Sequence, residues 1–512
     1  MEAATLSRGG PAAYAQSLRE AARARSRAFW IVAGLTALGA LLRFGTLGVQ
    51  SYHHDEIVTA SRILRDGFGH AMSAVGFSES APPLYYAIAW VWTQLTGTGE
   101  FGLRSVSALA GVATVPVSYL IGLELRGRRA GLMTAALVAV NPMLLWYSQE
   151  ARCYALFTLL CAISLLYCIR VLHRRRRRDV LGWGIASGLA LATHYFAVFP
   201  ILAEAVLLLR RRGRDSLPGL GIVAAVGLAL APLAIHQMSS GHAEWIGNFG
   251  LGHRLWETAA TFVTGETSDI IARPEQPGLS LVPLALALAA LALLAWRGER
   301  EQRRAAAIPL SVAAAAVGIP VVLALASPSK DYVLARNLMP ALVPLLVVVA
   351  IATTMPTARR LGAALGAGLL AYSLGFCVWA SISPDLQRPD WSAVAAKLGE
   401  PTAPRATVTW ALGEAPLRYY LSTGAIQVTP ADGYDWLVHE IDFVSDGKVP
   451  PPPARLLGPG FRESASEGAG RLYIRRFSRP GPGLAPLPLR RLKQARLDFR
   501  TNGVLLDGVG PG

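Results

Sequence analysis

Ionisable residues in this chain gather in short stretches that lie next to long apolar runs. The first stretch, residues 51–58, holds His53, His54 and the adjacent acids Asp55 and Glu56. Two acids directly after an apolar helix are costly at a membrane edge unless they face water, a partner or a substrate. The pair is therefore a candidate site for proton chemistry, and a solvated start of a loop is the alternative.

Four further stretches, 80–92, 146–154, 194–195 and 330–337, contain aromatic rings, and in three of them acids or bases lie beside the rings. Residues 146–154 contain Glu150 and Arg152, which cannot both face lipid at a helix end and so are predicted to point into a helix bundle, unless they form a structural ion pair. For His194, the alternative is a buried side chain that only makes hydrogen bonds. For Lys330 and Arg336, the alternative is that their charged ends reach from helix ends to the membrane surface. The other candidates in these stretches are Tyr85, Tyr154, His194, Lys330, Tyr332 and Arg336.

Acids, cations and aromatic rings at one level of a membrane suit a reaction in which a lipid-linked phosphate leaves and an acceptor hydroxyl attacks. The hydroxyl needs a general base, which a carboxylate can provide. The departing phosphate needs positive charge, which Arg152, Lys330 or Arg336 could supply. No nucleotide-binding signature is evident in the sequence, so the energy of the donor would arrive attached to a lipid.

The composition of the chain is that of a membrane protein. Of the 512 residues, 53% are apolar and 16% are charged, and the mean hydropathy is +0.38. These values exclude disordered, collagen-like and ordinary cytosolic proteins. The net charge of +16 is bunched between apolar runs, which indicates membrane topology and argues against nucleic acid as a partner. The four cysteines lie in or beside apolar runs, so we expect no disulfide and no zinc site.

Ten apolar runs are long enough to build membrane helices. Run 180–209 is too long for one span and breaks at Thr193, His194 and Tyr195, which predicts a helical hairpin. If this run forms a hairpin, the chain crosses the membrane eleven times and every arginine-rich loop lies on the same side. By the positive-inside rule this is the cytoplasmic side. The other runs are 29–47, 106–125, 130–146, 155–171, 217–235, 279–296, 305–326, 338–354 and 361–382.

The predicted fold is an all-α polytopic membrane bundle with a small C-terminal α/β domain outside. The first run lacks a cleavage motif and is expected to be a retained anchor in the plasma membrane. The aromatic stretch 80–92 predicts a helix at the outer interface, and strands are expected at 406–412, 425–429 and 472–477 with a helix at 391–398. The expected layout is a cytoplasmic segment 1–28, a membrane domain 29–382 with external loops 48–104 and 237–278, an external domain 383–480 and a flexible tail 481–512.

Several motifs together resemble the GT-C superfamily of integral-membrane glycosyltransferases, in the branch of protein O-mannosyltransferases and aminoarabinose (lipid A) transferases. The resemblance covers residues 29–355, and the stretch 387–391 resembles the start of the tail in bacterial members. The motifs are Asp55-Glu56, Pro82-Pro83-Leu84-Tyr85-Tyr86, Arg104 with Arg128-Arg129-Ala130-Gly131, the stretch 147–154, and Arg336-Asn337-Leu338-Met339-Pro340.

The resemblance implies a polyprenyl-phosphate sugar donor, inversion at the anomeric carbon, and Asp55 as the general base with Glu56 beside it. It also implies that Glu150 and Arg152 line the site. Ala81 stands where members commonly have a charged residue or a histidine before Pro-Pro, so the role of that residue is either absent here or taken by His53, His54 or Lys330. The expected substrate contacts are His54, Tyr85, Tyr154, His194 and Tyr332.

We expect no required cofactor. A divalent ion at His53, His54 and Asp55 is disfavoured, because adjacent residues of an extended segment point to opposite sides. The predicted function is transfer of mannose or a similar sugar to an external protein, lipid or cell-wall glycan. A flippase for lipid-linked saccharides and a diphosphate-dependent glycan ligase or polymerase are the alternatives.

Overall fold

The computed structural model describes residues 11–239, 246–247, 249–266, 278–327, 331–421, 423–428, 436–448, 451–452, 454–457, 460–494 and 502–508. The chain divides into two compact units. The bundle unit comprises Met1–Gly45, Met72–Ala89 and Arg104–Val378, and the sheet unit comprises Thr46–Ala71, Trp90–Leu103 and Trp379–Gly512. Each unit is described on its own.

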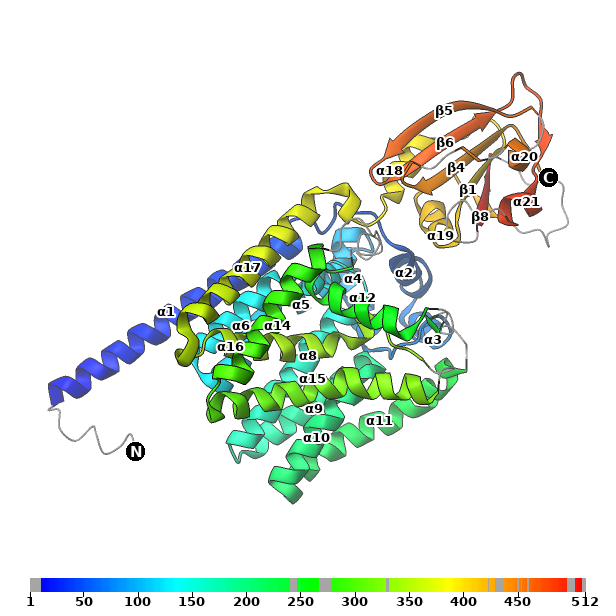
Figure 1. Ribbon diagram of the computed structural model, residues 1–512. Helices are drawn as coiled ribbons and strands as arrows, with labels where there is room; N and C mark the ends of the chain where they lie inside the picture. The colour runs from blue at the N-terminus through cyan, green and yellow to red at the C-terminus, as the bar shows by residue number, and fades with distance from the viewer. Residues whose placement is uncertain are drawn as a thin grey trace. The chain divides into compact units, whose positions relative to one another are not determined.

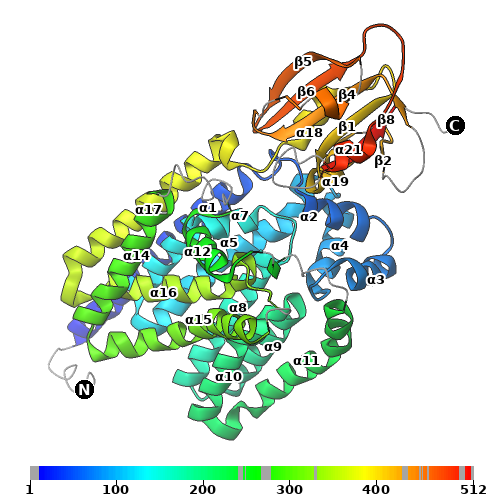
Figure 2. The same cartoon turned by 45° about the vertical axis from the view of Figure 1, so that its right-hand side comes forward.

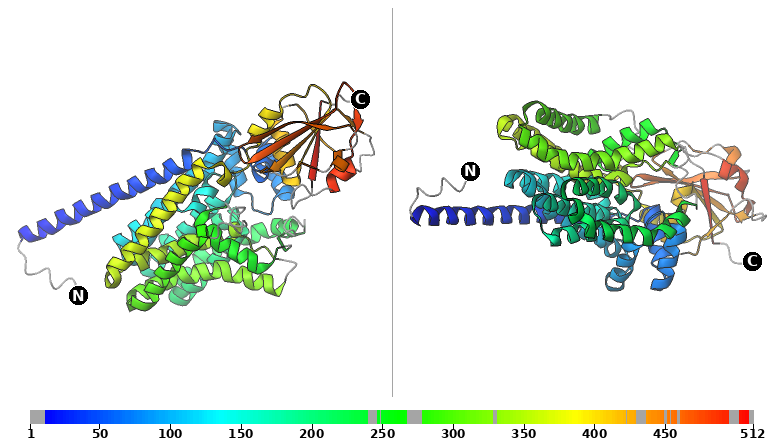
Figure 3. Two further views of the ribbon diagram at one scale, coloured as in Figure 1. Left: turned by 45° about the horizontal axis from the view of Figure 1, so that its top comes forward. Right: turned by 90° about the horizontal axis from the view of Figure 1, so that it is seen from below.

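The bundle unit is built from long apolar helices (Figure 1). In Figure 3 the first half of α1 extends past the other helices of this unit. The helices are α1 (Pro11–Phe44), α5 (Glu100–Arg126), α6 (Arg128–Val140), α7 (Pro142–Ser148), α8 (Tyr154–His173), α9 (Arg177–Thr193), α10 (Val198–Arg212), α11 (Leu217–Met238), α12 (Leu251–Thr264), α14 (Gly278–Arg297), α15 (Arg300–Ala326), α16 (Leu342–Thr353) and α17 (Arg359–Ile382).

Apolar side chains cover both the inside and much of the outside of this bundle. Trp183 of α9 and Phe157 of α8 are fully buried, whereas Leu228, Leu288 and Val322 are more than 60% exposed. Large exposed apolar side chains on helices whose backbone groups bond internally are typical of contact with lipid. The protein is therefore a multi-pass membrane protein.

Close helix packing in the bundle depends on small residues. At Gly184 of α9 an added Cβ atom would lie 2.8 Å from the Cα atom of Gly219 on α11. Two glycines facing each other let these backbones approach, as is common between membrane helices. Figure 2 shows α9 and α11 next to each other in the same part of the bundle.

Eight helices in the described part of the chain are long and apolar enough to cross a membrane, or nine if the bent pair α6–α7 forms one span. The count is lower than eleven because α9 has 17 residues and because α10 and α11 belong to one apolar stretch, Tyr195–Met238. Each predicted run corresponds to a helix or a helix pair, but the count of eleven crossings remains a prediction.

The predicted break in run 180–209 is confirmed. Helix α9 ends at Thr193, His194 is extended with φ −156° and ψ 132°, and a 3-10 turn, Tyr195–Ala197, leads into α10. The nitrogen Nδ1 of His194 accepts a hydrogen bond from the Phe196 amide at 3.2 Å, which caps the new helical segment. The break places His194 at the joint between two helices.

The sheet unit contains one six-stranded sheet with strand order β2-β8-β1-β4-β6-β5, of which only β1 and β4 are parallel neighbours in the described residues. Hydrophobic residues on its two faces pack against α18 and α19 on one side and against α20 and α21 on the other. The elements are β1 (Arg405–Trp410), β2 (Ile426–Gln427), β4 (Glu440–Asp446), β5 (Arg462–Ala469), β6 (Leu472–Ser478), β8 (Asn502–Asp507), α18 (Trp391–Leu398), α19 (Ala411–Tyr420), α20 (Ala454–Leu457) and α21 (Leu489–Gln494), with β3 (Leu437–Val438) and β7 (Ala485–Pro486) as a separate pair.

The structure differs from the expected flexible tail 481–512, because this stretch contains β7, α21 and β8. Asn502–Asp507 form β8, which lies between β2 and β1 in the sheet. The strand is held there because Val504, Leu505 and Leu506 are buried and because Arg405 donates a hydrogen bond to Asp507 at 2.8 Å. The expected helix 391–398 is confirmed as α18, and the expected strands overlap β1, β2 and β6.

Candidate active site

The acids Asp55 and Glu56 lie in the sheet unit on a short helix, α2 (His54–Ile57). His53 is extended and precedes the helix, and its amide donates a hydrogen bond to the Glu56 carboxylate at 3.0 Å. This contact caps the start of the helix, because the first amides of a helix have no partner in the helix itself. Glu56 is fully buried, so its carboxylate supports the local fold.

Asp55 differs from Glu56 in its surroundings. It is half-buried, and consecutive side chains on a helix point about 100° apart. Helix α2 continues into a π-helix, Val58–Ile63, a conformation that is frequent at functional sites. The neighbouring His54 is half-buried with its Nδ1 atom buried and unbonded in the described structure.

Contacts within the sheet unit hold the segment before α2 in place. The Tyr52 amide donates a hydrogen bond to the hydroxyl of Tyr420 at 2.7 Å, and that hydroxyl donates to Glu100 at 2.6 Å. The Ser51 hydroxyl donates to the Pro389 carbonyl at 2.9 Å and accepts from the Trp391 amide at 2.8 Å. Tyr420 ends α19, so elements of the C-terminal sheet domain fix the backbone that leads to Asp55.

The remaining candidates that the structure describes lie in the bundle unit. A 56° bend between α6 and α7 follows Asn141, whose side chain caps α7 by accepting a hydrogen bond from the Leu144 amide at 3.0 Å. Helix α7 ends at Ser148, and the linker to α8 is not helical. Glu150 lies in this linker and is buried, in agreement with the expectation that it points into the bundle.

Aromatic rings pack beside this linker. The rings of Tyr147 and Tyr154 have centroids 4.9 Å apart, those of Tyr154 and His194 are 5.8 Å apart, and His194 stacks on Phe157 at 4.6 Å. The hydroxyl of Tyr147 donates a hydrogen bond to Glu266. Tyr147 and Glu266 were not among the predicted site residues.

Arg336 lies on a 3-10 helix, Ala335–Ala341, and is half-buried. It is close enough to interact electrostatically with His194 and with Tyr147, and Glu150 also acts on Tyr147. Arg152 acts on His194 in the same way. The structure therefore brings five predicted residues into one group, called here the bundle cluster: Glu150, Arg152, Tyr154, His194 and Arg336.

Arg152 is held by an acid that the sequence analysis missed. Its guanidinium donates to both carboxylate oxygens of Glu79, at 2.8 and 2.6 Å, and Glu79 is buried. A bidentate pair of this kind fixes the orientation of both side chains. Glu79 lies three residues before Pro82 and was not among the residues predicted to take over the role of the charged residue or histidine that Ala81 replaces.

Two buried tyrosines adjoin this pair. The Arg152 guanidinium lies 6.0 Å from the ring centre of Tyr86. The hydroxyl of Ser107 donates to the Arg152 carbonyl at 3.1 Å and lies 3.4 Å from the hydroxyl of Tyr85. Burial raises the pKa of Tyr86 well above its ordinary value, although the charge of Arg152 acts in the opposite direction. Its phenol is therefore neutral at physiological pH.

The segment that carries Tyr332 and Arg336 is fixed by another ion pair. Arg254 of α12 donates to both carboxylate oxygens of Asp331, one of them at 2.8 Å, and both side chains are buried. Tyr332 is half-buried and its carbonyl accepts a hydrogen bond from Asn337 at 2.8 Å. Lys330 lies outside the described residues.

The described residues contain no group of three or more histidine, cysteine, aspartate or glutamate side chains that could hold a metal ion. They also offer no thiol nucleophile beside the cluster, because burial raises the pKa of Cys153 to about 12. A thiol with this pKa stays protonated near neutral pH. The chemistry available to the cluster is therefore that of carboxylates, guanidinium groups, phenols and imidazole.

Comparison with known proteins assigns a class to this arrangement. Residues 80–236 match the family described as dolichyl-phosphate-mannose-protein mannosyltransferase. The matched stretch contains Tyr85, Glu150, Arg152, Tyr154 and His194. The match confirms the predicted resemblance and the predicted enzyme class, a glycosyltransferase that uses a lipid-phosphate sugar donor.

Solved structures with a similar chain course include the following three. ArnT from Cupriavidus metallidurans bound to undecaprenyl phosphate has 14% identity and a TM-score of 0.48, over 87% of this chain and 97% of that chain. The oligosaccharyltransferase AglB from Archaeoglobus fulgidus has 12% identity and a TM-score of 0.44, over 78% of this chain and 60% of that chain. Arabinosyltransferase EmbB from Mycobacterium smegmatis has 11% identity and a TM-score of 0.37, over 72% of this chain and 32% of that chain. A comparison with curated proteins finds no match.

Proposed function

We propose that the protein is an inverting glycosyltransferase that moves one sugar from a polyprenyl phosphate to a hydroxyl group of an external acceptor. The description of the matched family, which names dolichyl phosphate mannose, supports mannose as the sugar and a protein as the acceptor. Lipid and cell-wall glycan hydroxyls are the other acceptors that the same chemistry serves. The N-terminus is cytoplasmic and the sheet domain is external in this proposal, because the arginine-rich loops then all face the cytoplasm.

The proposed reaction is a single displacement. The acceptor oxygen forms a bond to the anomeric carbon as the bond from this carbon to the phosphate oxygen breaks, which inverts the configuration. The electron pair of the broken bond stays on the polyprenyl phosphate. The hydroxyl proton passes to the carboxylate of Asp55, which is the general base in this proposal.

The difference between the two adjacent acids supports Asp55 in this role. Glu56 is fully buried and caps α2 through the His53 amide. Asp55 is half-buried on the same helical turn, so a substrate can approach it more easily. His54 beside it is a proposed substrate contact.

Positive charge for the departing phosphate is proposed to come first from Arg336. This side chain is half-buried and lies in the bundle cluster with Tyr154 and His194, which are proposed to contact the substrate. Arg152 contributes less, because Glu79 already neutralises its charge. Lys330 is proposed to contact the phosphate, and Tyr85 and Tyr332 are proposed to contact the substrate. Glu150 is proposed as a catalytic acid that lines the site.

The observation that carries the proposal is the collection of Glu150, Arg152, Tyr154, His194 and Arg336 in one cluster of buried and half-buried side chains within a membrane bundle. Four of these five residues lie in the stretch that matches the family. The predicted domain layout, with a membrane domain 29–382 and an external domain that begins at 383, is part of the same proposal.

The test is sugar transfer by purified protein in lipid nanodiscs, with a radiolabelled mannosyl phosphoryl polyprenol as donor. Asp55→Asn should lower the rate by about 10²- to 10⁴-fold, the usual contribution of a general base. Glu56→Gln is the matched control, because the amide oxygen of glutamine can still accept the bond from His53. Full activity of Asp55→Asn would remove this residue from the mechanism.

The same assay separates the proposal from its two alternatives. A flippase would leave the radiolabelled donor uncleaved. A ligase or polymerase of the diphosphate type would consume a diphosphate-linked oligosaccharide and leave the monophosphate donor unchanged. Addition of a chelator before the assay tests whether a divalent ion takes part.

A further inference from the structure

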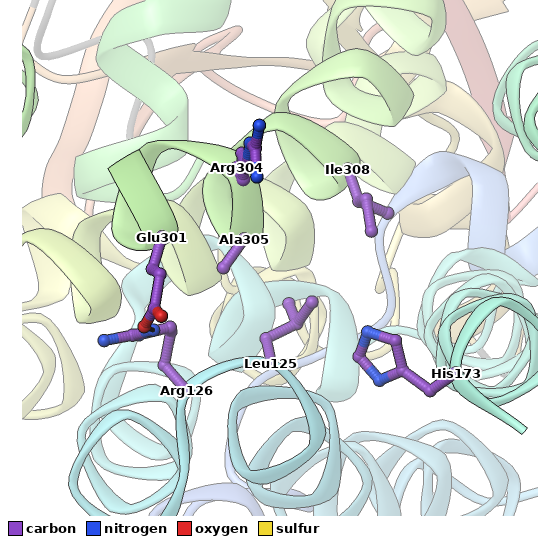
Figure 4. Close-up of a pocket in the computed structure, with 7 residues that line it drawn as sticks. All are labelled: Leu125, Arg126, His173, Glu301, Arg304, Ala305 and Ile308. Carbon is purple, nitrogen blue, oxygen red and sulfur yellow. Dashed lines mark hydrogen bonds and ion pairs between the residues drawn. The ribbon is translucent and has the colours of Figure 1, made fainter. Parts of the chain in front are cut away.

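A second polar site lies in the bundle unit, at the ends of α5, α8 and α15. Here a cavity of about 250 Å³ is lined by two arginines, one histidine, one glutamate and three apolar side chains. Figure 4 shows Arg126 and Glu301 together, with His173 apart from them beyond Leu125. The lining residues are Leu125, Arg126, His173, Glu301, Arg304, Ala305 and Ile308.

The arginines around this cavity differ in how their charges are compensated. Arg126 pairs with Glu301 at 3.0 Å, and Arg170 and Arg174 share the carboxylate of Glu124. Arg304 has no acidic partner in the described part of the chain, nor does His173. The cavity therefore carries a positive charge that the described protein groups leave uncompensated.

The position of the cavity determines which anion can reach it. Helix α5 ends at Arg126, α8 ends at His173, and α15 begins at Arg300. All three are long and apolar enough to span a membrane, so these helix ends lie at a membrane surface. A basic pocket between helices at such a surface fits the phosphate of a lipid head group.

The apolar part of the lining favours a lipid over a free anion. Leu125, Ala305 and Ile308 line the cavity beside the charged groups. Inorganic phosphate would gain nothing from these side chains, whereas the glycerol and the first methylene groups of a phospholipid would bury apolar surface on them. We propose that this cavity binds the phosphate head group of an anionic phospholipid through Arg304, with His173 and Arg126 beside it.

The proposal is tested by native mass spectrometry of the full-length protein released from detergent with added phosphatidylglycerol, phosphatidylcholine or inorganic phosphate. Wild-type protein should retain phosphatidylglycerol in preference to phosphatidylcholine. Arg304→Gln should weaken this binding about fivefold, the usual effect of one basic residue near an anionic membrane surface. His173→Gln should weaken it by a smaller factor.

Arg303→Gln is the matched control, because Arg303 is exposed on the same helix but does not line the cavity. It should leave phosphatidylglycerol binding unchanged. Equal losses in Arg303→Gln and Arg304→Gln would overturn the proposal, since general surface charge would then explain the binding. Equal retention of phosphatidylcholine, or displacement of the lipid by millimolar inorganic phosphate, would also overturn it.

Discussion

Two groups of arginines in the bundle unit differ in burial and in whether a carboxylate balances their charge. Arg152 and Arg254 are each held by one buried carboxylate through two hydrogen bonds. By contrast, the arginines at 175–178 are exposed and form no ion pair in the described structure. A buried arginine requires a partner in a defined geometry, whereas an exposed arginine contributes only charge. The first kind shapes the bundle cluster, and the second kind is expected to set the orientation in the membrane.

The largest effect is expected from breaking the pair between Glu79 and Arg152. Glu79→Gln would leave a buried guanidinium without its counter-charge, which costs roughly 3–5 kcal/mol in comparable cases. Thermal unfolding in detergent should show a strongly lowered midpoint, and sugar transfer should fall with it.

The matched control for this prediction is Glu124→Gln, which removes the acid shared by Arg170 and Arg174. Arg170 and Arg174 are 22% and 39% exposed, against 11% for Arg152, so water reaches these two guanidinium groups more easily and the loss should stay near or below about 1 kcal/mol. Equal destabilisation by the two substitutions would contradict the distinction between buried and exposed arginines.

A second prediction concerns Arg43, a buried arginine that, in the described part of the chain, donates hydrogen bonds to backbone carbonyls and to the Ser148 hydroxyl. Its space is limited by Gly111, where an added Cβ atom would lie 2.0 Å from the Ser148 oxygen and 2.8 Å from Nε of Arg43. Gly111→Ala should destabilise the protein by about 1–3 kcal/mol through overpacking. Gly34→Ala on α1 has no neighbour within 4 Å, so its unfolding midpoint should not fall.

The sequence predicted much of the bundle because apolar runs and arginine blocks are local signals. The break at His194 is an example, since one polar interruption in run 180–209 marked the joint between α9 and α10. Glu79 was missed because its partner Arg152 is 73 residues away. Strand β8 was missed for the same reason, since nothing near it in the chain indicates its neighbours in the sheet.

A third prediction uses pH to test the pair of Arg254 and Asp331. Hydrogen bonds from Arg254 hold the pKa of Asp331 below its usual range. The stabilisation is thus complete above the unfolded pKa of about 4 and is lost as the pH falls through the lower folded value. The unfolding midpoint of wild-type protein should therefore drop more steeply below pH 4 than that of Asp331→Asn. Parallel curves for the two proteins would show that the pair adds no stability.

The smallest effect is expected from Arg177→Gln at the start of α9. Arg177 is exposed, and substitutions at such surface positions usually change stability by less than about 0.5 kcal/mol. The unfolding midpoint and the rate of sugar transfer should both match wild type. A clear loss of stability or of activity would indicate that Arg177 is held by a carboxylate, as Arg152 and Arg254 are.

The position of β8 between β2 and β1 has a consequence for how the sheet domain folds. Its strand partner β1 is far away in the chain, and the pair of Arg405 and Asp507 joins residues 102 positions apart. Contacts between such distant residues make folding slow, because a long loop must close before they form. Until β8 arrives, β1 and β2 each present an open strand edge, so this domain should depend on chaperones more than the helices do.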